Sequence, residues 1–118
     1  VRHHNVLQPF GEGLEPFDSI GIMNLLHCLP GDMETKSVVL ENTREMLNPG
    51  GVLFGSTIIY RKGWRNPLTA AALAFNNWRG IMTNRDDDVE VLNDNLGRLF
   101  RESGLRIIGC EVLFWARK

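Results

Sequence analysis

One run of residues combines an apolar strand with polar side chains that follow it directly. Residues 18–26 are mostly apolar, as expected of a strand buried on both faces of a parallel sheet. Asn24 and His27 come at the end of this run. In open α/β sheets, ligands bind where the parallel strands end, so both side chains are candidates for a binding site. An unperturbed imidazole titrates near neutrality, which makes His27 a candidate acid–base group.

Both candidates also have a purely structural interpretation. A histidine at a strand–helix junction can simply pack there and hydrogen-bond to the backbone, and a polar residue after an apolar strand is a common turn entry. No metal site is predicted. His3 and His4 are adjacent and face opposite ways in a strand, and the three carboxylates of 86–88 favour a solvated charge cluster at a helix start.

The elements around this run alternate between strands and helices. Residues 1–7 are expected to be the tail of a strand, and a helix is expected to begin at the N-cap candidate Asp32. The run 48–51, Asn-Pro-Gly-Gly, is expected to end that helix, and 52–59 is rich in β-branched residues typical of a strand.

The second half is predicted to hold two helices and a hairpin. A helix starts at Asn66-Pro67, and its inner face is expected to carry an apolar stripe: Leu68, Ala71, Ala72, Phe75 and Trp78. Another helix is expected from 86–88 to a C-cap at Gly104. Residues 105–116 are expected to form an antiparallel hairpin that turns near Gly109-Cys110.

Composition sets bounds on the class of protein. A chain of 118 residues with 43% hydrophobic and 23% charged residues is one globular domain or less. A net charge of −1 gives no electrostatic reason to expect nucleic acid or an anionic membrane as partner. No apolar run approaches the ~20 residues of a membrane span. Cys28 and Cys110 lack CxxC spacing and are expected to be buried free thiols, so a cytoplasmic location is predicted.

The motifs occur in an order that resembles class I S-adenosylmethionine-dependent methyltransferases acting on small molecules. The resemblance lies in "FDSIGIMNLLHCLP" at 17–30 and "LNPGGVLFGST" at 47–57. It implies an α/β, Rossmann-like three-layer sandwich with sheet order 3-2-1-4-5-7-6. The chain would supply the end of strand 3, strands 4 and 5, and the closing antiparallel hairpin of strands 6 and 7.

The resemblance also implies what the 118 residues lack. The family's glycine-rich GxGxG loop and its strands 1 and 2 have no counterpart in this sequence. Residues 1–118 are therefore predicted to be the C-terminal part of a single methyltransferase domain, with a helical insertion at 60–88 as a candidate lid. Strand 4 would then be an exposed edge of the sheet.

Further implications concern single residues. Asn5 and Val6 stand where the family contacts the adenine of S-adenosylmethionine, although Asn5 also suits a strand end. Met23, Asn24 and Leu25 match the strand that meets the methionine part of the cofactor. His27 is the predicted catalytic residue. The predicted substrate-binding residues are two aromatic residues of the insertion, Tyr60 and Trp64.

The function implied is methyl transfer from S-adenosylmethionine to a small organic acceptor, with no nucleic-acid or membrane partner. Orientation alone can accelerate such a displacement, so a strong base is not essential. The alternative is a truncated, non-catalytic Rossmann-like module that serves in protein interaction. A nicotinamide dehydrogenase is disfavoured, because "LNPGGVLFGST" does not resemble those enzymes.

Overall fold

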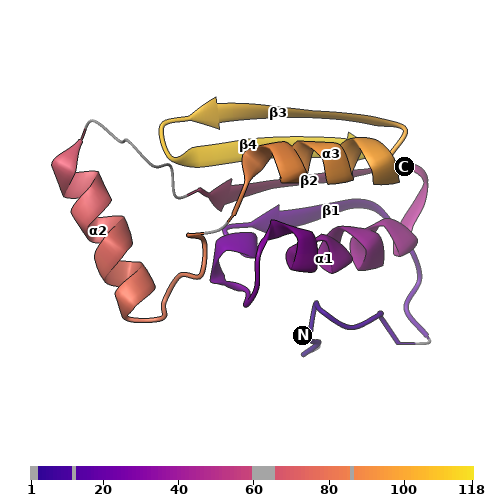
Figure 1. Cartoon of the computed structure of the whole chain (residues 1–118). Coiled ribbons are helices and arrows are strands. Elements are labelled where there is room, and N and C mark those ends of the chain that lie inside the picture. The colour runs from indigo at the N-terminus through magenta and orange to yellow at the C-terminus, as the bar shows by residue number, and fades with distance from the viewer. Residues whose placement is uncertain (1–2, 12, 60–65, 86) are drawn as a thin grey trace.

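A four-stranded mixed sheet organises the chain (Figure 1). The computed structural model describes residues 3–11, 13–59, 66–85 and 87–118. In chain order the elements are β1 (Phe17–Met23), the 3-10 turn η1 (Leu26–Cys28), α1 (Met33–Glu45), β2 (Leu47–Ile58), α2 (Pro67–Trp78), α3 (Val89–Leu99), β3 (Glu102–Ile108) and β4 (Glu111–Arg117).

The strand order is β1-β2-β4-β3. β1 runs parallel to β2, whereas β4 is antiparallel to both β2 and β3. This order matches strands 4, 5, 7 and 6 of the predicted sheet, so the α/β prediction and the closing hairpin are confirmed. Among the described residues β1 has only β2 as a neighbour, the arrangement expected of strand 4 when strands 1 and 2 are not included.

Helices α1 and α3 lie side by side over one face of the sheet, and α2 stands beyond its end (Figure 1). The core lies between these two helices and the sheet, where Leu92 and Leu96 of α3 are fully buried. The other face carries Phe54, Leu113 and Trp115, which are 46%, 38% and 44% exposed. We call it the open face, because no helix of the described residues covers it.

All three helices begin at a side-chain cap. The Asp32 carboxylate accepts a hydrogen bond from the Thr35 N–H at 2.8 Å, and the Asp88 carboxylate accepts one from the Glu90 N–H at 2.8 Å. Asn66 caps α2 in the same way. These contacts satisfy backbone donors that have no partner in the first turn of a helix. The predicted cap at Asp32 and the predicted helix start at Asn66-Pro67 are therefore confirmed.

Three boundaries differ from the prediction. Residues 3–10 contain a turn and no strand, because no neighbouring strand among the described residues can pair with them. β2 begins at Leu47 rather than at 52 and includes the Pro-Gly-Gly segment. Gly104 lies inside β3, directly opposite Trp115, and the C-cap of α3 is Phe100.

Burial corrects two further predictions. The apolar stripe expected on the inner face of α2 is exposed, with Leu68 at 80% and Trp78 at 75%, and the buried residue of this helix is Leu73. The thiols are free, but Cys28 is exposed and Cys110 is only partly buried.

None of the helices in the described part of the chain is long and apolar enough to cross a membrane.

Candidate functional site

The carboxyl ends of β1 and β2 meet at one edge of the sheet, since the two strands are parallel. β1 ends at Met23, and Asn24 turns the chain with a φ of 53°. Asparagine is one of the few residues other than glycine that adopts this left-handed conformation readily. The Asn24 N–H donates to the Ser56 carbonyl at 2.9 Å, and the Ser56 hydroxyl donates to the Asn24 side-chain oxygen at 3.4 Å. The end of β1 is thereby fixed against β2.

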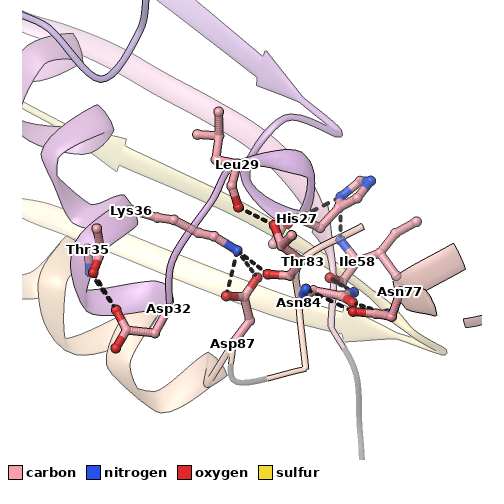
Figure 2. Close-up of polar contacts among 11 residues, drawn as sticks. His27, Leu29, Asp32, Thr35, Lys36, Ile58, Asn77, Thr83, Asn84 and Asp87 are labelled. Atoms are coloured by element: carbon pink, nitrogen blue, oxygen red, sulfur yellow. Dashed lines mark hydrogen bonds and ion pairs between the residues drawn. The ribbon is translucent and has the colours of Figure 1, made fainter. Parts of the chain in front are cut away.

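His27 lies in η1 at this same edge and is 4% exposed. Its Nδ1 accepts a hydrogen bond from the Ile58 N–H at 3.2 Å (Figure 2). The Thr57 hydroxyl lies 3.5 Å from the same nitrogen. A backbone N–H can only donate, so Nδ1 is unprotonated in the neutral ring. The neutral imidazole therefore carries its proton on Nε2, and no described group bonds to that atom.

The surroundings of His27 favour the neutral ring. Burial is the main cause that lowers the pKa of His27, and the positive charge of Lys36 lowers it further. Glu111 has the opposite, smaller effect. Because the pKa of His27 lies below its ordinary value near neutrality, the ring is neutral at pH 7.

A buried ion pair supports the segment that packs against His27. Lys36 of α1 is fully buried, and its ammonium group donates to both carboxylate oxygens of Asp87, at 2.7 and 2.8 Å, and to the Thr83 carbonyl at 2.8 Å. The Thr83 N–H in turn donates to the His27 carbonyl at 2.9 Å. All three ammonium protons have acceptors, as a buried charge requires.

This pair corrects the expectation of a solvated charge cluster at 86–88, because Asp87 is 7% exposed and paired. Sequence reasoning missed Lys36 altogether. Its spacing on α1 could have revealed it, because Lys36 lies on the same buried stripe as Met33, Val39 and Leu40. A lysine on such a stripe is buried, and a buried charge requires a partner of opposite charge. No group of three metal-ligating side chains occurs in the described ranges.

Asn5 and Val6 lie in a turn before β1. The Asn5 side-chain oxygen accepts from the Leu7 N–H at 3.1 Å, and the Val6 carbonyl accepts from the Asn42 side chain at 3.0 Å. Val6 packs against the core, whereas Asn5 is exposed. No hydrogen bond joins Asn5 to Asn24 within the described part of the chain.

The other predicted residues differ in exposure. Met23 is 58% exposed at the end of β1, and Leu25 is half-buried against the core. Tyr60 and Trp64 lie outside the described residues. The edge thus brings Met23, Asn24 and His27 together at the ends of β1 and β2.

Comparison of sequences relates the chain to named methyltransferases. No protein-family model matches it. Demethylluteothin O-methyltransferase of Streptomyces thioluteus is 32% identical over 112 residues, which cover 95% of this chain and 49% of that enzyme. The uncharacterized protein YbcY of Escherichia coli is 35% identical over 120 residues, which cover 98% of this chain and 62% of YbcY. The chain spans about half the length of the curated relatives it matches.

Solved structures share the fold at lower sequence identity. An O-methyltransferase family protein from Burkholderia thailandensis superposes with a TM-score of 0.71 and 18% identity, over 99% of this chain and 35% of that protein. Human N-acetylserotonin methyltransferase, solved with S-adenosylmethionine, has a TM-score of 0.66 and 18% identity, over 99% of this chain and 33% of that enzyme. In sequence the chain is similar to about half the length of enzymes named methyltransferases, and it shares its fold with about a third of solved methyltransferase chains.

Proposed function

We propose that this chain is the C-terminal part of a methyltransferase that uses S-adenosylmethionine to methylate a small organic acceptor. The observation that carries this proposal is the match along 95% of the chain to an enzyme named an O-methyltransferase, together with the shared fold. That name favours oxygen as the accepting atom. When bound, the cofactor supplies the electrophilic methyl group.

The turn at Asn5 and Val6 suits the adenine ring. No described group accepts a hydrogen bond from the Val6 N–H, so it is available for a ring nitrogen. The Asn5 side-chain oxygen accepts one bond from the Leu7 N–H and keeps a second lone pair for an exocyclic amine. Burial of the Val6 side chain against the core keeps this turn in place.

The end of β1 suits the methionine part of the cofactor. Met23 offers an exposed apolar side chain, and the left-handed turn at Asn24 leaves an exposed amide next to it. Leu25, half-buried on the core, anchors the turn from the other side. An apolar contact beside a hydrogen-bonding amide matches the amphipathic chain of this cofactor.

His27 is the proposed catalytic residue. Its Nδ1 is occupied by the Ile58 N–H, so the atom left for the reactants is the protonated Nε2. We assign to Nε2–H the role of a donor that orients the acceptor oxygen, which loses its proton to solvent before the methyl group is transferred, in preference to a base that removes that proton. Orientation of the reacting atoms can supply much of the acceleration of such a displacement.

The acceptor is assigned to the insertion at 60–88. Tyr60 and Trp64 directly follow β2 in sequence and supply aromatic surface for an organic molecule. On α2, Phe75 and Trp78 form an exposed aromatic pair with ring centroids 5.9 Å apart. A lid of this composition would exclude water from the reaction.

The domain proposal rests on the open face and on the unpaired edge of β1. A further strand beside β1 and helices on the open face would bury both, so we place the rest of a single domain there. Hydrogen exchange of the complete protein tests this. The β1 amides that point away from β2 should be protected, and free exchange of those amides would contradict the proposal.

Two remaining expectations stand as predictions. A cytoplasmic location agrees with the two free cysteines. The alternative function, a non-catalytic interaction module, has no specific observation in its favour. Calorimetry on the complete protein separates the two functions. We expect S-adenosylmethionine to bind in the micromolar range, about −8 kcal/mol, and absence of both heat and thermal shift would favour the interaction module.

The role of His27 is tested by His27→Ala in the complete protein, with His3→Ala as the matched control. His3 is exposed and lies outside η1. We expect turnover to fall about 100-fold for His27→Ala, because the acceptor would lose the contact that orients it, while cofactor affinity stays nearly unchanged. A lower melting temperature with turnover per folded molecule unchanged would show that His27 is only structural.

A further inference from the structure

Two side chains complete the sheet where β1 stops. β1 ends at Met23, but β2 continues to Ile58, whose edge groups then have no strand beside them. The Ile58 N–H donates to His27 Nδ1 at 3.2 Å, and the Ile58 carbonyl accepts from the Asn84 side-chain nitrogen at 2.8 Å (Figure 2). Unpaired backbone groups at such a position would be costly. His27 and Asn84 thus hold the same residue from one side of the strand.

Asn84 is held in turn by α2. It is fully buried, and its side-chain oxygen accepts from the Asn77 side-chain nitrogen at 2.8 Å. The Asn84 N–H donates to the Asn77 side-chain oxygen at 3.4 Å. A carbonyl can only accept, so the Asn84 nitrogen must face Ile58 and its oxygen must face Asn77. The orientation of the amide is therefore fixed by both partners.

The residue before Asn84 holds the backbone of His27. The Thr83 N–H donates to the His27 carbonyl at 2.9 Å, and the Thr83 hydroxyl donates to the Leu29 carbonyl. The Lys36 ammonium, itself paired with Asp87, donates to the Thr83 carbonyl. Residues 83 and 84 consequently hold His27 at its backbone directly and at its ring through Ile58.

We propose that Asn84 is a positioning residue for His27. It keeps the end of β2 from fraying, so that the Ile58 N–H stays on Nδ1 and the proton stays on Nε2. Because Asn84 is also bonded to Asn77, the position of α2 affects the orientation of the His27 ring. The inference rests on the proposed function only in so far as His27 acts in turnover, because the ring geometry itself is independent of activity.

Two variants and a control test the proposal in the complete protein. Asn84→Ala removes the contact with Ile58. Asn77→Asp replaces the donor that faces the Asn84 oxygen, which should turn the Asn84 amide over and aim its oxygen at the Ile58 carbonyl. Asn77 is only half-buried, so this variant is expected to fold. The control is Asn95→Ala, a buried asparagine of α3 whose partners are Glu34 and Arg98.

The first readout is the ¹⁵N NMR spectrum of the His27 ring, which distinguishes the two tautomers without any activity. We expect Nε2–H alone in the parent protein and in Asn95→Ala, and a mixture of tautomers in Asn84→Ala and Asn77→Asp. The second readout is turnover, expected to fall about 10-fold in these two variants with cofactor affinity changed less than twofold.

The outcomes separate this inference from the proposed function. Absence of turnover in the parent protein contradicts the proposed function. The ring spectra still show in that case whether Asn84 positions the His27 ring. An active parent whose Asn84→Ala and Asn77→Asp variants keep the parent ring spectrum and the parent turnover overturns the positioning role of Asn84 alone. The positioning role is also overturned if Asn84→Ala and Asn77→Asp lose as much stability as Asn95→Ala while the spectrum of the His27 ring stays unchanged.

Discussion

The two faces of the sheet differ in what covers them, although their sequences are similar. Along β4, Val112, Phe114 and Ala116 are buried under α1 and α3, with 0%, 3% and 0% exposure. The alternate residues Leu113 and Trp115 point to the open face and are 38% and 44% exposed. A strand that is apolar on both faces is typical of a sheet covered on both sides. β4 therefore has the composition for two helical layers, while the described residues supply one.

The open face has its own local order. Phe54 pairs in register with Gly21, and Trp115 pairs with Gly104. A Cβ atom on Gly21 would come within 3.0 Å of the Phe54 ring, and one on Gly104 within 2.8 Å of the Trp115 ring. Each aromatic ring thus lies over a glycine on the neighbouring strand, an arrangement that supports glycine in a sheet. The centre of this face is apolar, and charged residues lie beside it: Arg106 pairs in register with Leu113, and Glu102 with Arg117.

The largest expected effect is on the unfolding free energy, and it differs between two neighbouring residues of β4, Phe114 and Trp115. Phe114→Ala should cost about 3–5 kcal/mol of unfolding free energy, because it leaves a cavity under the helices. In residues 1–118 taken alone, Trp115→Ala should cost about 1 kcal/mol, since the ring is half in solvent there. Chemical denaturation of both variants checks the difference, and equal losses in these residues would show that Trp115 is shielded from solvent. In the complete protein, where we place the rest of the domain on the open face, the two losses should be similar.

The next prediction concerns the charged pair on the covered side. Lys36→Met should destabilise the fold by about 3–5 kcal/mol, because Asp87 would remain buried without its cation. The double variant Lys36→Met/Asp87→Asn should recover part of that loss. The same denaturation experiment measures both. A single variant as stable as the parent would show that Asp87 reaches solvent when Lys36 is removed.

A smaller effect is expected from pH. The pKa of His27 is lowered in the folded state, so the unfolded chain binds more protons below pH ~6.5. The contribution of His27 to stability is therefore present above the unfolded value and is lost as pH falls from there toward the folded value. His27→Gln, whose side-chain oxygen can still accept from Ile58, should lack this loss. Melting temperatures of both proteins between pH 7.5 and 5 provide the test, and parallel curves would contradict it.

Local signals determined most of the fold. Asp32 and Asn66 are caps that act within three residues, and the hairpin depends on a turn at Gly109-Cys110, so the sequence predicted all three. The prediction of Gly104 as a helix C-cap was wrong. The role of this glycine depends on the Trp115 ring of the neighbouring strand and not on the preceding helix.

The site was predictable only in part. His27 and Asn24 follow an apolar strand, a pattern visible in the sequence, and both lie at the predicted edge. The partners Lys36 and Asp87 are 51 residues apart, and Asn84 contacts Ile58 across 26 residues. Such contacts depend on how the chain crosses the end of the sheet, which no local pattern records. The roles of all the predicted site residues, His27 and Asn24 included, stay predictions.

The smallest expected effect is that of the ion pair between Arg117 of β4 and Glu102 of β3. Their closest atoms are 3.7 Å apart, and the side chains are 50% and 54% exposed. Water screens such a pair, so Arg117→Gln should change the unfolding free energy by less than about 0.5 kcal/mol. Raising the salt concentration from 0.05 to about 0.5 M should remove even that difference. A salt-resistant loss above about 1 kcal/mol would indicate that this pair is shielded from solvent. The open face would then be covered at the end of β4, and the contrast between the two faces of the sheet would be smaller than the described residues indicate.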